Sequence, residues 1–290
     1  MKMRLCGFAL IYHIRRGILG RWKWYMTAVI IFALQWLLAR QGARLLAASG
    51  ISEAEASYMD YVLFSFRGLA PRMNMAFDAH FDLPMPWICA FAGGLVSSLG
   101  YSGMDADGHA VQLAVRAGSR RLWWASMCLW CGVSAGAYLL LAYFTLFVLS
   151  LAAGVPLSLT MTNEFAALFL GAQYYTAGTV GIFAGLELGV IMPFLFLLFL
   201  NMLQLVLNLF CGRAGAFIAC VAVLILSAYY SSGLAVGNYA IVMRSAYMIE
   251  DGFAAREGQA VYLMLIMLLC IVGLVRISRL DLLPRGRERG

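Results

Sequence analysis

Residues 188–210 read LGVIMPFLFLLFLNMLQLVLNLF, and this stretch decides what kind of protein the chain forms. It carries no charged side chain, and its polar side chains are the amides of Asn201, Gln204 and Asn208. About 20 consecutive apolar residues are enough for a helix to cross the hydrocarbon core of a bilayer. The stretch therefore predicts a transmembrane helix.

The composition of the whole chain agrees with this prediction. Hydrophobic residues make up 63% of the 290 residues and charged residues 12%, whereas a soluble domain is about half apolar and about a quarter charged. So few charges cannot cover a water-exposed surface, which excludes a soluble protein. We therefore attribute the net charge of +7 to Lys and Arg residues that orient the chain in the membrane. No nucleic-acid partner is expected.

The same length criterion predicts an all-α integral membrane protein with six transmembrane helices in a single domain over residues 1–290. The predicted spans are residues 24–46, 86–101, 122–151, 186–210, 214–230 and 259–275. Residues 165–185 are apolar enough for a seventh crossing, but this crossing would place the Arg-rich C-terminal tail outside. We therefore interpret them as an outer, interfacial or re-entrant segment.

The distribution of charge predicts the orientation. With the N-terminus in the cytoplasm, the inner segments hold 15 of the 21 Lys and Arg residues and four of the 14 Asp and Glu residues. Because basic residues favour the cytoplasmic side, both termini are predicted to be cytoplasmic, in a multi-pass protein of the cell membrane. The inner segments are 1–23, 102–121 and 276–290, together with the short connection at Arg213 between the fourth and fifth spans. The outer segments are 47–85, 152–185 and 231–258.

The first inner segment has the pattern of an amphipathic helix. Between residues 3 and 20, apolar side chains such as Leu5, Phe8 and Ile11 recur at helical spacing among basic residues. This pattern predicts a helix on the inner membrane surface, with its bases toward the lipid phosphates. The alternative is a basic tail that only sets the topology.

Polar side chains of the fourth predicted span lie at helical spacing. Gln204 and Asn208 follow Asn201 by three and seven residues, and Glu187 precedes Asn201 by nearly four turns, which predicts one shared face. Polar groups inside a membrane are costly and often functional. Two interpretations stay open: a face that lines a translocation path or a dimer seam, and ordinary interhelical hydrogen bonds worth about 0.6 kcal/mol each.

Small residues repeat every four positions in two of the predicted membrane segments. Gly181, Gly185 and Gly189 form one such ladder, and Gly132 and Gly136 form another. Ladders of this kind permit two helices to approach closely.

No pattern typical of an enzyme occurs, so no catalytic or metal-binding residue and no cofactor are predicted for this chain. A phosphate-binding loop, a G-x-S-x-G nucleophile motif and a His/Cys/Asp cluster at metal-ligand spacing are all absent from the sequence. Asp78, His80 and Asp82 alternate in an outer loop, which we interpret as solvated acids. Cys128 and Cys131 form a C-x-x-C inside an apolar helix, where buried thiols are the plainer interpretation.

The inner segment before the third span is the most specific part of the sequence. It reads QLAVRAGSRRLWW at residues 112–124. A short helix over 108–116 followed by a Gly-Ser turn would present a polar surface to a soluble partner, formed by Gln112, Arg116, Gly118, Ser119, Arg120 and Arg121. The alternative is a basic membrane anchor with interfacial tryptophans, Trp123 and Trp124, which explains only the second half of the stretch.

This stretch resembles the first cytoplasmic loop of ABC-2-type transporter permeases from Gram-positive bacteria, where a similar L-I-R-x-G-S-R-K-x-W follows the second span. Other stretches fit the family in order. DYVLFSFRG at 60–68 is similar to its first outer loop, and LPMPW at 83–87 to the entry of its second span. SAYYSSG and GNYAIVMRS, within residues 227–245, are similar to the end of its fifth span and the segment after it. The resemblance covers nearly the whole chain.

The resemblance implies a permease subunit that works with separate ATP-binding cassette ATPase subunits and with a second permease subunit, as a homodimer or a heterodimer. Residues 112–121 would be the loop that couples to the ATPase, and residues 1–23 the elbow at the membrane surface. ATP and Mg would bind to the ATPase, so this chain would not itself be an enzyme. The expected function is export of a peptide, lipid-like or drug-like substrate. The alternative is a non-transporting membrane assembly or sensory protein.

Overall fold

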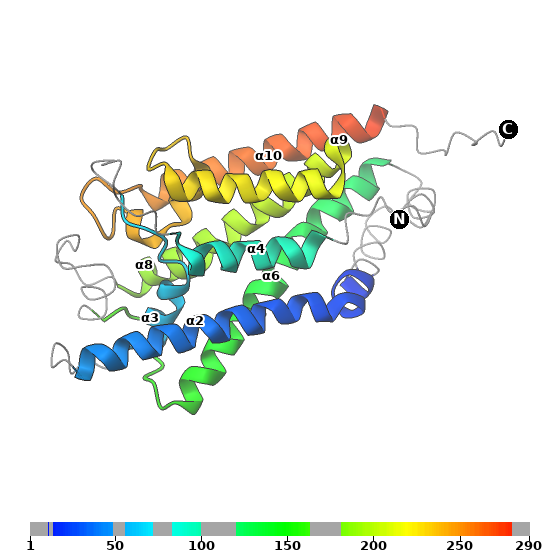
Figure 1. The fold of residues 1–290 in the computed structure, drawn as a ribbon. Coiled ribbons are helices and arrows are strands. Elements are labelled where there is room, and N and C mark those ends of the chain that lie inside the picture. The colour runs from blue at the N-terminus through cyan, green and yellow to red at the C-terminus, as the bar shows by residue number, and fades with distance from the viewer. Residues whose placement is uncertain are drawn as a thin grey trace.

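The computed structural model describes residues 11, 14–48, 56–71, 83–99, 120–162 and 181–279, and within them it is a bundle of helices without a β-strand. Four helical stretches of the described chain are long and apolar enough to cross a membrane. They contain α2 (Trp22–Ala48), α6 (Arg120–Ala152), α9 (Met192–Tyr229) and α10 (Ala255–Arg279). A fifth apolar helix, α4 (Met85–Leu99), is shorter. Figure 1 shows these helices side by side along one axis of the bundle.

The helix α9 turns back on itself at Gly212. This residue has φ +72° and ψ 176° inside an otherwise helical run, a conformation that glycine adopts without steric cost. The thiol of Cys220 donates to the carbonyl oxygen of Leu200 at 3.7 Å, although a straight helix would separate these residues by about 30 Å. The two arms of α9, before and after Gly212, therefore lie antiparallel, and they occupy the predicted spans 186–210 and 214–230.

The first arm of α9 is preceded by irregular helix. α8 (Ile182–Leu186) leads into a π-helical turn, η3 (Glu187–Ile191), which continues into α9. The hydroxyl of Tyr143 in α6 donates to the carbonyl oxygen of Gly189 at 2.7 Å. This side chain therefore satisfies a backbone group within the π-turn. Of the predicted outer segment at 165–185, residues 165–180 lie outside the described residues.

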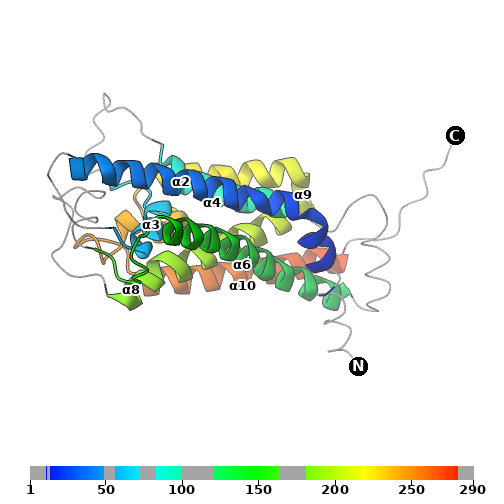
Figure 2. The ribbon, with the colours of Figure 1, turned by 90° about the horizontal axis from the view of Figure 1, so that it is seen from below.

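Hydrogen bonds between helices give their relative directions. Tyr25 and Ser134 share a hydrogen bond of 2.7 Å, and Nε1 of Trp36 donates to Oγ of Ser150 at 3.2 Å. Both sequence numbers increase together along the interface, so α2 and α6 run parallel (Figure 2).

The core of the bundle is aromatic where α4, α9 and α10 meet. Trp87 stacks on Phe196 with ring centroids 5.7 Å apart, and Phe91 meets Phe196 edge-on at 4.8 Å. Tyr262 of α10 lies 5.6 Å from Phe196 on the other side. All four rings are fully buried, and aromatic pairs of this geometry contribute about 0.5–1.5 kcal/mol each beyond the area that they bury.

The predicted outer loop 47–85 contains a buried helix, α3 (Tyr58–Ser65), packed against α2 and α6. Ser57 and Asp60 form a capping box at its start. The carboxylate of Asp60 also accepts hydrogen bonds from the backbone nitrogen and the hydroxyl of Thr162, at 3.0 and 2.9 Å. Burial raises the pKa of Asp60 above its usual value. The two outer segments that follow α2 and α6 are therefore tied together through one carboxyl group.

The outer segment 231–258 is held by a buried arginine. It contains two short 3-10 helices, η4 (Val236–Ala240) and η5 (Val242–Arg244). The guanidinium of Arg244 donates to the carbonyl oxygens of Ser227 and Ala228 at 2.8 Å each, to that of Leu69 at 2.9 Å, and to Oδ1 of Asn238. Burial lowers the pKa of Arg244 to about 10, so it stays charged at neutral pH. The guanidinium lies at the C-terminal end of the second α9 arm, where the free carbonyl oxygens of a helix favour a positive charge.

Basic residues gather at one end of the bundle. Nη1 of Arg120 donates to the carbonyl oxygen of Ser278 at 3.1 Å, and the guanidinium of Arg276 lies over the ring of Phe210 at 5.1 Å. The start of α6, the end of α10 and the turn at Gly212 therefore share one end, which we call the basic end (Figure 1). Its described basic residues are Arg15, Arg16, Arg21, Lys23, Arg120, Arg121, Arg213, Arg276 and Arg279. The described acidic residues lie toward the opposite end: Asp60, Glu187, Glu250, Asp251 and Glu257.

The interpretation of Trp123 and Trp124 as interfacial anchors is wrong. Both rings are buried, with 4% and 3% of their surface exposed. Nε1 of Trp124 donates to the carbonyl oxygen of Cys270 at 2.9 Å. The exposed tryptophans at this end are instead Trp22 and Trp24 of α2. A cluster of Trp and Arg in sequence does not distinguish a ring that faces lipid from one that packs on a neighbouring helix.

The predicted surface helix at residues 3–20 is described only at residues 11 and 14–20. Residues 14–17 are helical, and a 3-10 turn, η1 (Leu19–Arg21), joins them to α2. A methyl group added at Gly17 would come within 2.6 Å of Nε1 of Trp130. The segment before α2 therefore packs across the basic end against α6.

Candidate functional site

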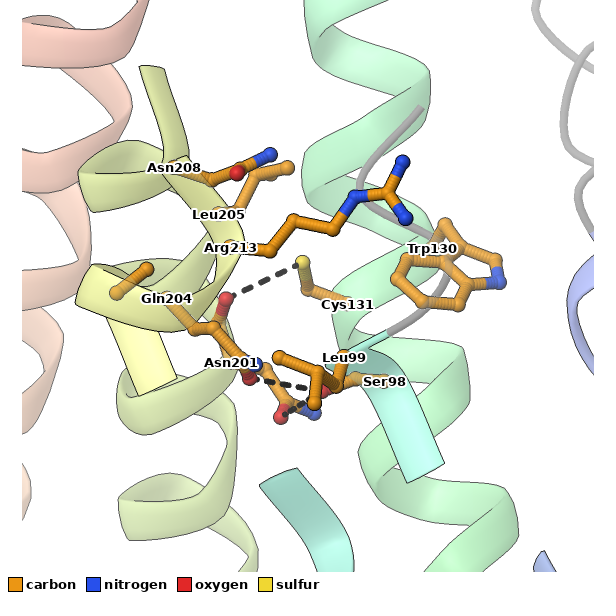
Figure 3. Close-up of a pocket in the computed structure, with 10 residues that line it drawn as sticks. Ser98, Leu99, Trp130, Cys131, Asn201, Gln204, Leu205, Asn208 and Arg213 are labelled. Carbon is orange, nitrogen blue, oxygen red and sulfur yellow. Dashed lines mark hydrogen bonds between the residues drawn. The ribbon is translucent and has the colours of Figure 1, made fainter. Parts of the chain in front are cut away.

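A small pocket lies between α4, α6 and the two arms of α9, toward the basic end (Figure 3). We call it the polar pocket after the polar residues in its wall, although most of its open surface is apolar. Each of these helices contributes to its wall. The lining residues are Ser98, Leu99, Trp130, Cys131, Asn201, Gln204, Leu205, Asn208, Arg213 and Ala216. The space between them is about 10 Å³, close to the lower limit for one water molecule. The pocket is therefore closed to any larger ligand in this conformation.

Close packing of α4 on α9 brings the polar side chains of the pocket together. A methyl group added at Gly94 would come within 2.6 Å of Cδ1 of Leu197, so glycine sets this distance between the helices. One turn further along, Ser98 meets Asn201. The thiol of Cys131 in α6 reaches the carbonyl oxygen of Asn201 at 3.8 Å.

Ser98 is the centre of the hydrogen bonding in the pocket. Its hydroxyl oxygen lies 3.0 Å from Oδ1 of Asn201, 3.1 Å from Oε1 of Gln204 and 3.0 Å from the carbonyl oxygen of Leu95. A serine hydroxyl has one hydrogen to donate, so it serves one of these three oxygens at a time. The structure thus joins α4 to α9 through a serine that sequence reasoning did not select.

The amide nitrogens of Asn201 and Gln204 have no hydrogen-bond partner in the structure. Both residues are nearly inaccessible, with 2% and 5% of their surface exposed. An unpaired buried donor costs about 1–3 kcal/mol. Turning either amide would let its nitrogen donate to Oγ of Ser98, which has a single hydrogen for the three oxygens around it.

A basic residue, Arg213, lies at the end of the pocket opposite these amides. Arg213 follows the turn at Gly212 and lines the pocket together with Asn208 (Figure 3). Among the lining residues, Arg213 has the only formal charge. Of the four residues predicted to share one face, Asn201, Gln204 and Asn208 thus line one pocket.

The structure places Glu187 elsewhere. Its carboxylate accepts hydrogen bonds from the hydroxyl of Tyr247 at 2.6 Å and from Nε2 of Gln259 at 2.5 Å. The hydrogen bond to Glu187 raises the pKa of Tyr247. Because the hydrogen bonds of a π-turn span one residue more than those of an α-helix, η3 rotates Glu187 off the stripe that continuous α-helical spacing predicts. Glu187 therefore links the first arm of α9 to α10 and the outer segment.

Most of the predicted coupling loop lies outside the described residues, namely Gln112, Arg116, Gly118 and Ser119. The structure describes the last two residues of this set, Arg120 and Arg121, which begin α6 and are exposed at the basic end. The guanidinium of Arg120 is bonded to the end of α10.

The cysteines of the described residues are free thiols. Cys128 turns toward α10, with its sulfur 3.9 Å from that of Cys270, while Cys131 lines the pocket. In the described part of the chain, no group of three or more His, Cys, Asp or Glu side chains could hold a metal ion. Asp78, His80 and Asp82 lie outside that part.

No protein-family model matches the chain, and no curated protein or solved structure matches it either.

Proposed function

We propose that the chain is the permease subunit of an ABC transporter, powered by separate ATP-binding cassette ATPase subunits and paired with a second permease subunit. One observation carries the proposal. The stretch 112–124, which resembles the coupling loop of such permeases, runs directly into α6, and α6 lines the polar pocket three turns later with Trp130 and Cys131. A displacement of the loop would therefore reach the pocket through a single continuous helix.

In this proposal the chain crosses the cell membrane six times. The passes are α2, α4, α6, the two arms of α9, and α10. The parallel course of α2 and α6 and the reversal of α9 at Gly212 agree with this path. The basic end faces the cytoplasm, because Lys and Arg accumulate on that side, and both chain termini follow it there.

The mechanism is a two-state movement driven from the basic end. Closure of the ATPases on ATP would displace the coupling loop and, with it, the start of α6. Arg120 and Trp124 bind backbone oxygens of α10, so α10 would move with α6 relative to α4 and α9. This movement would open the closed pocket, as binding energy at one site shifts the population of states at another.

The proposal is tested by reversing charges of the loop. Arg116→Glu and Arg121→Glu should abolish co-purification of an ATP-binding cassette ATPase from native membranes, and with it the vanadate-sensitive ATPase activity of the purified complex. Arg120 is left intact because its guanidinium also holds the end of α10. Arg279→Glu makes the same charge change at the same end and is the matched control.

Two results would count against the permease. Equal loss of ATPase in the Arg279→Glu control would show that the loop has no special role. A wild-type chain that retains no such ATPase under any mild extraction would favour the alternative, a membrane assembly or sensory protein.

A further inference from the structure

We propose that Cys128 and Cys270 form a modification site, at which a hydroperoxide joins α6 to α10 through a reversible disulfide bond. The two cysteines belong to different helices and are 142 residues apart in the sequence. The proposed transport function makes no use of them, so the site is argued and tested separately from it.

The first argument is the direct contact between the two thiols. The sulfur of Cys270 lies 3.9 Å from that of Cys128, and both thiols are free. At this distance the sulfurs touch, so no other atom has to leave the space between them. The sulfurs of a disulfide are about 2.05 Å apart, and these two therefore have to approach by about 2 Å to form the bond.

The second argument is the close packing of the two helices beside the pair. One turn before Cys128, Nε1 of Trp124 donates to the carbonyl oxygen of Cys270 at 2.9 Å. The indole ring also packs on Gly273, where an added methyl group would come within 2.0 Å of it. The Cα atoms of disulfide partners must lie within about 7 Å of each other. Two helices that pack this closely meet that condition more readily than helices separated by large side chains.

The third argument is the choice of partner. Cys131 follows Cys128 by about one turn of α6, but its thiol reaches the carbonyl oxygen of Asn201 at 3.8 Å and lines the polar pocket (Figure 3). The two cysteines of the C-x-x-C motif thus face different helices. Cys128 faces α10, where Cys270 lies, and Cys131 faces α9.

The surroundings of the pair favour a disulfide over a bound metal ion. In the part of the chain that the structure describes, no group of three or more His, Cys, Asp or Glu side chains could hold a metal ion. Two thiolates around one soft monovalent ion such as Cu⁺ would leave a net negative charge between apolar helices, where an unpaired charge is costly. A disulfide carries no charge.

The pair can be reached through the lipid. Both thiols are half-buried, and their neighbours in sequence, Leu129 and Ile271, are exposed apolar side chains. A hydroperoxide with an apolar tail dissolves in the membrane and so arrives at this surface. With the basic end in the cytoplasm, the pair lies in the inner half of the membrane, on the side where thiols are kept reduced and disulfides are usually transient and redox-sensing. The reduced pair is therefore the resting state.

The reaction takes two steps and needs no other reagent. One thiol, as its thiolate, attacks an oxygen of the hydroperoxide ROOH, the O–O bond breaks, and the alcohol ROH leaves a sulfenic acid on that cysteine. The second thiol attacks the sulfenic sulfur, the S–O bond breaks, and water leaves as the disulfide forms. The two sulfurs together lose two electrons, which reduce the O–O bond. Two thiols and one ROOH thus give one disulfide, one ROH and one water.

The test counts thiols in the full-length chain. A variant keeps Cys128 and Cys270 and has alanine at the other five cysteines. Membranes that contain it are treated with tert-butyl hydroperoxide, and the remaining thiols are labelled after denaturation with a polyethylene glycol maleimide that slows the chain on a gel. Two labelled thiols before treatment should become none, and dithiothreitol should restore both. The oxidised chain should run as a monomer, because the bond lies within one chain.

A matched variant keeps Cys131 and Cys270 instead, which moves the position on α6 by about one turn. Because the thiol of Cys131 is turned toward α9, this pair should close about tenfold more slowly or not at all. The wild-type chain supplies a second measurement if a variant fails to fold. After oxidation and proteolysis, mass spectrometry should find a peptide that links residue 128 to residue 270. The oxidised wild type should also melt about 5 °C or more above the reduced chain, and Cys128→Ser should remove this difference.

Three outcomes overturn the site. Both thiols of the Cys128 and Cys270 variant could persist under the hydroperoxide, and the wild type could lack the linked peptide. The pair of Cys131 and Cys270 could close equally fast, which would show only that the helices are mobile. The oxidised product could resist dithiothreitol, which would show oxidation of single thiols to sulfinic acid. None of these results bears on the ATPase, whose association Arg116→Glu tests independently.

Discussion

Gly273 and Trp124 show how a single residue sets the distance between two helices. A methyl group at Gly273 would lie 2.0 Å from Cζ2 of Trp124, far inside van der Waals contact. The indole is fixed because its nitrogen donates to Cys270 of the same helix. The close approach of α6 and α10 therefore depends on the absence of one side chain.

Gly273→Ala is expected to destabilise the bundle by about 1–3 kcal/mol, the usual cost of adding a methyl group to a filled core. Gly132→Ala is the control, since a methyl group there would only touch Leu198 at 3.9 Å, and it should leave the stability unchanged or slightly increased. Thermal unfolding of the two variants in the same detergent measures the difference. Equal midpoints would contradict the packing argument.

The glycine spacing in the sequence predicted only some of these contacts. Gly185 and Gly189 do approach α3, with added methyl groups 3.3 Å from Met59 and 3.1 Å from Val62. Gly273 belongs to no ladder and was not singled out, although it makes the closest approach in α10. A repeat of small residues shows where a neighbouring helix can pack closely. Whether it does so depends on the side chain that the neighbouring helix places opposite the repeat.

At the scale of elements, Glu187 joins three segments that are distant in the sequence. Its carboxylate on η3 binds Tyr247 of the outer segment and Gln259 of α10. η3 is also where the regular α-helical hydrogen bonding is interrupted, and π-turns occur often at functional sites. The outer end of the first α9 arm is thus fastened by side chains as well as by its own backbone.

Glu187→Gln should loosen this connection. The neutral amide keeps the shape, and its N–H can donate to the hydroxyl of Tyr247 while its oxygen still accepts from Gln259. Both hydrogen bonds lose the negative charge that strengthens them, so both are weakened. Hydrogen exchange of the backbone around residues 245–252 is expected to become about tenfold faster, as local opening costs less. Glu257→Gln changes the same charge on the exposed first turn of α10 and should leave exchange unchanged. Similar acceleration in both variants would show a general charge effect.

Sequence patterns predicted the long helices better than the elements between them. A run of apolar residues suffices to place α2, α6, α9 and α10, because lipid imposes a minimum length. The eight residues of α3 are too few for that criterion. Their burial comes from packing on α2 and α6, and Asp60 is bonded to Thr162, about a hundred residues later.

The polar pocket was predictable only in part. Asn201, Gln204 and Asn208 follow from helical spacing, because amides in a span are rare enough to notice. Ser98 does not, because a serine in a helix can bond its own backbone, as it does here to Leu95. Arg213 was assigned to topology alone, and its place in the pocket follows from the reversal at Gly212, a tertiary feature that local spacing does not encode.

At the scale of the whole molecule, the charged residues are distributed unequally between the two ends of the helix bundle. Nine of the 14 described Lys and Arg residues lie where α6 begins and α10 ends, whereas the described acids lie where the outer segments pack. The two arms of α9 meet at the basic end, so in the proposed six-span path the turn at Gly212 and the segment after the second arm face opposite sides of the membrane.

Cysteine labelling tests this arrangement on whole cells. Cys211 is exposed beside the turn, and Leu234 is 94% exposed beyond the second arm. In a chain that keeps Cys211 as its only cysteine, a membrane-impermeant maleimide should react only after the cells are permeabilised. In a cysteine-free chain carrying Leu234→Cys, it should react with intact cells. Reversed labelling would invert the orientation that the basic residues predict. Labelling of both positions from outside would show that the arms of α9 do not cross the membrane, because a hairpin that spans it has its turn and its end on opposite sides.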